Sequence, residues 1–174
     1  MDTGRAIRLK GFTVMKQDGF HAPPDLIRVG LEDDRARGIE AAFIAEMGQR
    51  YKSGGPGPVT SDVFDPPAGY FVLAMIDSRP VGCGGFRQLH RAKAEIKRMY
   101  VDPSGRGMGL GRQILQHLEE RALAAGYREA WLEAGTLQPE AISLYVSFGY
   151  SPIKPYGEFK DDPRSRCFMR SLIT

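Results

Sequence analysis

A glycine-rich segment past the middle of the chain has the clearest potential for chemistry. It runs from Asp102 to Gly111, with glycine at positions 105, 107, 109 and 111. Glycines let the backbone bend so that successive N–H groups point into one concavity, and the first turn of a following helix adds its own unpaired N–H groups. Such a loop can hold a pyrophosphate, and Arg106 and Arg112 would add positive charge beside it.

The spacing of these glycines excludes two common nucleotide-binding motifs. The dinucleotide fingerprint requires G-x-G-x-x-G after an early strand, and no three of the four glycines have that spacing. A P-loop requires Lys followed by Ser or Thr after its last glycine, whereas Gly111 is followed by Arg112 and Gln113. The loop therefore belongs to another class of phosphate-binding site.

The elements that must position this loop follow from hydrophobic periodicity. An apolar strand precedes the loop, and an amphipathic helix follows it and ends at Gly126. Along the whole chain we expect strands at 26–29, 70–77, 81–89, 94–101, 129–134 and 167–172, and helices at 35–52, 110–125 and 139–148. This order predicts an α/β fold with a mixed sheet.

Composition limits the class of protein. The chain has 174 residues with 42% hydrophobic and 26% charged residues, which suits one globular domain. The longest apolar run, Tyr70–Ile76, is too short for a membrane span, and no secretory signal is visible at the start, so we expect a cytoplasmic protein. A net charge of +3 gives no support to nucleic-acid binding. Two distant cysteines and three scattered histidines predict neither disulfides nor a metal site.

Three segments, in order, carry a resemblance to a known family. Arg106, Gly109 and Gly111 meet the pattern Arg/Gln-x-x-Gly-x-Gly, and in this the chain resembles the GCN5-related N-acetyltransferase (GNAT) superfamily. Residues 94–103 resemble the superfamily's fourth strand, and residues 141–150 resemble its late helix. The resemblance implies a mixed, mostly antiparallel central sheet flanked by helices.

The resemblance also sets the expected domain organisation. It covers about residues 70–153, which we expect to form the core cofactor-binding region of a single acetyltransferase domain spanning 1–174. Residues 1–25 are interpreted as a variable lead-in.

The cofactor that the resemblance implies is acetyl-CoA, with no metal. Its pantetheine arm would lie between the fourth and fifth strands, and one N–H, of Met99 or Tyr100, would polarise the thioester carbonyl. Gln138 stands where many members have an asparagine that contacts the pantetheine. The backbone groups expected to hold the cofactor are those of Met99, Tyr100 and Val101 for the arm and Arg106, Gly107, Met108, Gly109, Leu110, Gly111 and Arg112 for the pyrophosphate.

Two side chains are the candidates for proton transfer. Tyr145 matches the superfamily's general acid, since a phenol stays protonated at neutral pH and can protonate a departing thiolate; the alternative is a core tyrosine. Glu95 stands where several members carry a glutamate base, and strand alternation places it on one face with Lys97 and Met99. The alternatives to that base are an ion pair of Glu95 with Lys97 or Lys93, and a water chain.

These observations favour an enzyme that moves an acetyl group from acetyl-CoA to a primary amine, by direct attack in a ternary complex. The second hypothesis is a non-catalytic acyl-CoA-binding or regulatory module of the same fold. The acceptor would be a small-molecule or peptide amine, with no nucleic-acid or membrane partner, and a homodimer stays open. The identity of the amine and the acyl-chain preference cannot be predicted from these residues.

Overall fold

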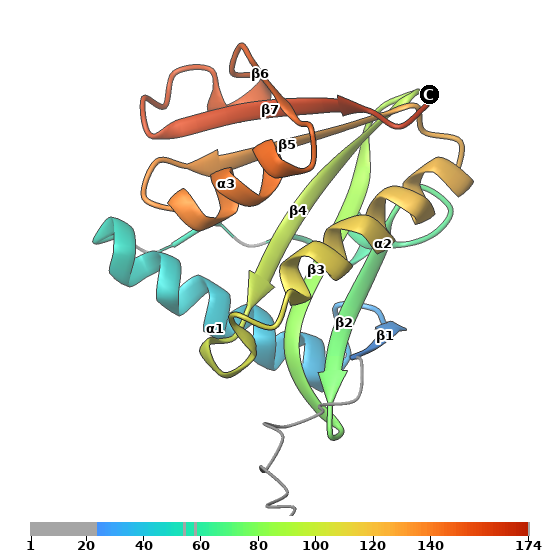
Figure 1. The fold of residues 1–174 in the computed structure, drawn as a ribbon, viewed down its shortest axis with the longest axis vertical. Coiled ribbons are helices and arrows are strands. Elements are labelled where there is room, and N and C mark those ends of the chain that lie inside the picture. Colours follow the sequence, from blue (N-terminus) through green and yellow to red (C-terminus); the bar gives the residue numbers. More distant parts are fainter. Residues whose placement is uncertain (1–23, 54, 58, 174) are drawn as a thin grey trace, which may run out of the picture.

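The computed structural model describes residues 24–53, 55–57 and 59–173, so most of the predicted lead-in lies outside the described residues. A seven-stranded sheet organises them, in the order β1-β2-β3-β4-β5-β7-β6 (Figure 1). Its strands are β1 (Asp25–Arg28), β2 (Tyr70–Ile76), β3 (Arg79–His90), β4 (Lys93–Val101), β5 (Glu129–Gly135), β6 (Ser151–Ile153) and β7 (Ser165–Ser171). Its helices are α1 (Asp34–Tyr51), α2 (Leu110–Ala124) and α3 (Pro139–Ser147). The predicted mixed, mostly antiparallel sheet is confirmed, because β4 and β5 form the one parallel pair among these strands.

The helices begin and end at residues suited to caps. Asp33 caps α1 by accepting a hydrogen bond from the N–H of Arg35 at 2.9 Å. Helix α2 follows Gly109, whose φ is +75°, and the chain leaves it at Gly126, whose φ is +93°. Both glycines adopt a left-handed conformation that other residues enter only at a cost.

Two hydrophobic clusters cover the two faces of the sheet. One cluster packs α2 and Tyr145 of α3 against β2, β3, β4 and β5. The other packs Ala36 and Ile39 of α1 against the opposite side of β2 and β3. On the face covered by α2, Gly84 of β3 lies so close to the helix that a Cβ there would be 3.0 Å from side chains of Ile114 and Leu118. The absence of a side chain at Gly84 therefore lets α2 pack closely against β3.

Strands β4 and β5 pair along only part of their length. Their register runs from Lys93 opposite Glu129 to Ile96 opposite Leu132. Beyond these residues, β4 continues to Val101 and β5 to Gly135, and Figure 1 shows the two strands diverging toward their carboxyl ends. One edge of β4 is thereby left free of its neighbour from residue 97 onward.

A β-bulge interrupts β4 just after the last paired residue. Cys83 of β3 lies opposite Tyr100 and Gly85 lies opposite Lys97, so Arg98 and Met99 together face a single β3 residue. The extra residue reverses the alternation: Met99 packs on the α2 side, while Tyr100 packs on the α1 side. The prediction that Met99 shares a face with Glu95 and Lys97 is therefore wrong.

Candidate active site

A cleft of about 580 Å³ opens where β4 and β5 separate. Glu95, Met99, Gln138 and Tyr145 line it, so the structure brings together four of the residues predicted from the sequence. The walls add apolar side chains from α1 and the loop that follows it, namely Phe43, Met47, Tyr51, Val59 and Val63. The cleft therefore offers an apolar wall opposite polar, ionisable groups.

Tyr145 lies on α3 and is 4% exposed. Burial raises the pKa of its phenol, and the negative charge of Glu133 raises it further. The hydroxyl therefore stays protonated throughout the neutral range. Its ring packs at a tilt against Tyr150, with centroids 5.9 Å apart.

Glu95 is buried, and both of its carboxylate oxygens have partners. Arg87 Nε donates to Oε2 at 2.5 Å, and Tyr156 Oη donates to Oε1 at 3.1 Å. Lys97 Nζ lies 3.5 Å from Oε1, as the ion-pair alternative predicted, whereas Lys93 pairs with Glu129. The structure thus favours the ion-pair alternative, and a role for Glu95 as base stays a prediction.

Glu133 is a residue of the cleft that the sequence interpretation missed. It lies near the end of β5 and lines the cleft with Tyr145. Within the described part of the chain, no lysine or arginine nitrogen lies within 4 Å of its carboxylate. Burial is the main cause of a raised pKa for Glu133, and a hydrogen bond with Ser165 opposes it. Neither the burial of this carboxylate nor its lack of a cationic partner among the described residues can be read from the sequence around it.

The glycine-rich loop has the donors that an anion requires. Among the residues that the structure describes, the backbone N–H groups of residues 107–112 donate to no protein acceptor, whereas that of Arg106 donates to Pro103 O at 3.4 Å. Gly107 and Gly109 have positive φ values, +79° and +75°, which bend the loop before α2 begins. Free N–H groups at the start of a fifteen-residue helix fit a pyrophosphate.

The two arginines of the loop are held by other side chains. Arg106 forms an ion pair with Glu46 of α1 at 2.6 Å and donates from Nε to Val101 O at 3.0 Å. Arg112 donates to Ser147 Oγ at 3.0 Å, and its guanidinium lies over the ring of Phe148. The positive charge of Arg106 is therefore neutralised by Glu46 in this structure.

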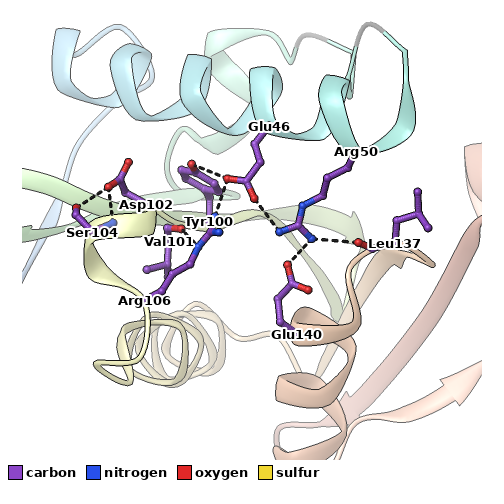
Figure 2. A network of polar contacts seen from close by, with 9 residues as sticks. All are labelled: Glu46, Arg50, Tyr100, Val101, Asp102, Ser104, Arg106, Leu137 and Glu140. Atoms are coloured by element: carbon purple, nitrogen blue, oxygen red, sulfur yellow. Dashed lines mark hydrogen bonds and ion pairs between the residues drawn. The ribbon is translucent and has the colours of Figure 1, made fainter.

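Glu46 lies at the centre of a polar network that connects α1 with β4, the glycine-rich loop and α3 (Figure 2). It accepts hydrogen bonds from Tyr100 Oη at 3.0 Å and Arg50 Nη2 at 2.7 Å, in addition to that from Arg106. Arg50 in turn donates to Leu137 O at 3.0 Å and pairs with Glu140 of α3. Helix α1 thus contacts both β4 and the start of the helix that carries Tyr145.

This arrangement agrees with a match to the acetyltransferase (GNAT) family model over residues 36–150. The chain belongs to the GNAT family. The match includes the split strands, the glycine-rich loop and the helix that carries Tyr145, so the resemblance inferred from three motifs is confirmed.

Two relatives of this GNAT chain share 36% of aligned residues with it. An IAA acetyltransferase of Azospirillum brasilense aligns over 103 residues, which is 59% of this chain and 67% of that protein. An uncharacterised N-acetyltransferase of Bacillus subtilis aligns over 93 residues, 52% of this chain and 62% of that protein. The chain therefore matches about two thirds of the length of these relatives.

Solved structures confirm the fold. A crystal structure of a putative acyl-CoA N-acyltransferase from Klebsiella pneumoniae superposes with a TM-score of 0.73 and 26% identity, covering 86% of this chain and 98% of that one. A GNAT acetyltransferase from Elizabethkingia anophelis, solved with acetyl-CoA bound, superposes with a TM-score of 0.53 and 18% identity, covering 66% and 92%. The chain is thus an acyltransferase of GNAT fold. None of its described helices has the length and apolar character needed to cross a membrane.

Proposed function

We propose that this protein transfers an acetyl group from acetyl-CoA to a primary amine by direct attack within a ternary complex. One observation carries the proposal: a single cleft joins the free edge of β4 to a protonated tyrosine and to Glu133, whose carboxylate has no lysine or arginine partner among the described residues. Acetyl-CoA supplies an activated acetyl group as a thioester, and the amine receives it as an amide.

The binding residues follow from the unpaired backbone groups. The N–H groups of residues 107–112 hold the pyrophosphate, and the free edge of β4 from Met99 to Val101 holds the pantetheine arm. The N–H of Met99 or Tyr100 faces the acetyl carbonyl. Gln138, which lines the cleft at the start of α3, contacts the arm in place of the usual asparagine.

Tyr145 acts as the general acid. Its buried hydroxyl keeps its proton at neutral pH, and it lines the cleft in which the thioester would lie. Donation of this proton to the sulfur lets coenzyme A leave as a neutral thiol instead of a thiolate.

We assign the acceptor's ammonium to Glu133. Four carboxylates line this part of the cleft, those of Glu95, Glu133, Glu158 and Asp162. Three are paired with cations, Glu95 with Arg87 and Lys97, Glu158 with Lys97, and Asp162 with Arg164. Among the described residues Glu133 has no lysine or arginine partner, so it can attract the ammonium and remove its proton, directly or through water. Its raised pKa makes it a stronger base than an ordinary carboxylate.

The proposal is tested by thiol release from acetyl-CoA, with the purified protein and a broad panel of amines. We expect release that depends on one class of primary amine and yields the N-acetylated product by mass spectrometry. Saturable binding of acetyl-CoA without acetylation of any amine in the panel would instead favour a non-catalytic acyl-CoA-binding module.

A further inference from the structure

The bulge in β4 is formed by a residue that is not suited to it. Arg98 has a φ of +60°, in the left-handed region that favours glycine, although it lies within a strand. A non-glycine residue in this conformation is strained and persists only where its surroundings hold it. The contacts that hold Arg98 therefore determine the shape of β4 at this point.

Arg98 is held from three directions. Its guanidinium forms an ion pair with Glu40 of α1 at 3.2 Å, and its Nη2 donates to the carbonyl of Gly57 in the loop after α1. The thiol of Cys83 in β3 donates to the backbone carbonyl of Arg98 at 3.3 Å. Burial raises the pKa of this thiol, so it retains the proton that it donates.

The ion pair is almost completely withdrawn from solvent. The side chain of Arg98 is 4% exposed and that of Glu40 is 15% exposed. A buried pair of this kind often adds little net stability, but removal of one partner leaves an uncompensated buried charge and is strongly destabilising. Net stability alone therefore does not account for a buried pair at this position.

The position of the bulge indicates a further role for the pair. Pairing between β4 and β5 ends at Ile96, two residues earlier, and Arg98 and Met99 both line the cleft. Because of the bulge, the side chain of Met99 packs on the α2 side of the sheet and that of Tyr100 packs on the α1 side. The same stretch of backbone supplies the N–H groups that the proposed function directs toward the acetyl carbonyl.

We propose that Arg98 is a positioning residue, and that its buried ion pair with Glu40 holds the β4 bulge so that a backbone N–H of Met99 or Tyr100 meets the thioester carbonyl. This role rests on the proposed function. Glu40 lies on α1, which also supplies Phe43 and Met47 to the apolar wall of the cleft. The ion pair therefore also fixes β4 relative to that wall.

The test compares Arg98→Gly with the double variant Arg98→Gly/Glu40→Gln. Glycine accepts the positive φ, so the single variant removes the side chain and leaves Glu40 buried without a partner. The double variant also removes that charge. We expect the melting temperature to fall in the single variant and to recover in part in the double variant.

The decisive measurement is the infrared carbonyl stretch of bound acetyl-CoA labelled with ¹³C in the acetyl carbonyl. A hydrogen bond to the carbonyl lowers this frequency, so the wild-type complex should show a downshift relative to free acetyl-CoA. We expect both Arg98 variants to lose the downshift, while their Kd for CoA stays within about threefold because the loop N–H groups are unchanged. Once an acceptor is known, turnover should fall about 10²-fold, the scale of one lost oxyanion donor.

A matched control is the ion pair of Glu119 and Arg170, which joins α2 to β7 at 2.7 Å outside the cleft. Glu119→Gln/Arg170→Gln should lower the melting temperature and keep the wild-type carbonyl frequency.

If the Arg98 variants do not fold, Glu40→Gln is the milder variant and should lose part of the downshift. A wild-type frequency in the folded Arg98 or Glu40 variants would overturn the positioning role alone. Failure of the wild-type protein to bind acetyl-CoA would overturn the proposed function, and the positioning role with it.

Discussion

Glu133 and Glu95 both line the cleft but have different partners, so replacement by glutamine should affect the enzyme differently at the two positions. Glu133→Gln removes the carboxylate that has no cationic partner in the described part of the chain. The value of kcat/KM near neutral pH should therefore fall about 10²-fold and recover in part in alkali, where free amine is abundant. For the wild-type enzyme, kcat/KM should rise with pH through the pKa of the base and then level off. Profiles of kcat/KM from pH 6 to 10 measure both effects.

Glu95→Gln is the matched comparison. Its carboxylate binds Arg87, Lys97 and Tyr156, so we expect a lower melting temperature and a pH profile of unchanged shape. A profile altered by Glu95→Gln and unaltered by Glu133→Gln would return the base to Glu95, as the resemblance first implied.

A second prediction at the scale of the residue concerns Tyr145. Tyr145→Phe should slow turnover about 10²-fold or more and leave the Kd of acetyl-CoA nearly unchanged, because the hydroxyl supplies a proton and the ring keeps its packing. Tyr150→Phe is the control, since this neighbouring tyrosine is also buried but does not line the cleft. Equal turnover in the two variants, where chemistry limits the rate, would remove Tyr145 from the mechanism.

Sequence reasoning found Tyr145 because it lies in a motif, and it missed Glu133 because nothing local distinguishes it. The importance of Glu133 comes from burial and from the pairing of three other carboxylates, one of which, Asp162, lies near the end of the chain. Arg87 and Tyr156, which hold Glu95, also come from separate elements. Such partnerships arise only when the fold brings these residues together.

At the scale of the element, the glycine-rich loop should depend on the absence of side chains. Gly109→Glu would introduce a side chain and a negative charge beside the free N–H groups, so acetyl-CoA should no longer raise the melting temperature. Gly126→Glu is the matched control: it has a similar positive φ and equally open space at its Cβ, but it lies at the other end of α2. Stabilisation of a folded Gly109→Glu protein by acetyl-CoA would show that the pyrophosphate binds elsewhere.

Most elements could be predicted from periodicity, whereas irregular ones could not. The strand predicted over 94–101 and the helix predicted over 110–125 are observed with boundaries shifted by one residue. The short strand Ser151–Ile153 was missed because three residues, one of them proline, show no periodicity. The bulge was missed because Arg98 takes a conformation for which sequence patterns expect glycine.

At the scale of the whole molecule, the network around Glu46 connects parts of the chain that the split sheet would otherwise leave apart (Figure 2). Burial alone would raise the pKa of Glu46, but hydrogen bonds from Arg106, Arg50 and Tyr100 outweigh it and lower the pKa. A carboxylate whose pKa is lower in the folded than in the unfolded state stabilises the fold above its unfolded pKa of about 4.3. That stabilisation is lost as the pH falls through the lower, folded-state value.

Glu46→Gln should therefore lower the melting temperature at pH 7 by about 2–6 °C, the usual scale for a part-buried charged network in a chain of this size. The difference from the wild-type protein should shrink as the pH falls below about 4.3, because the wild-type carboxylate then becomes protonated and loses the same ion pairs. Glu120→Gln, on the exposed face of α2, should show no such difference at any pH. Melting curves of the three proteins from pH 3 to 8 measure these effects, and a difference for Glu46→Gln that does not change with pH would contradict the network's electrostatic role.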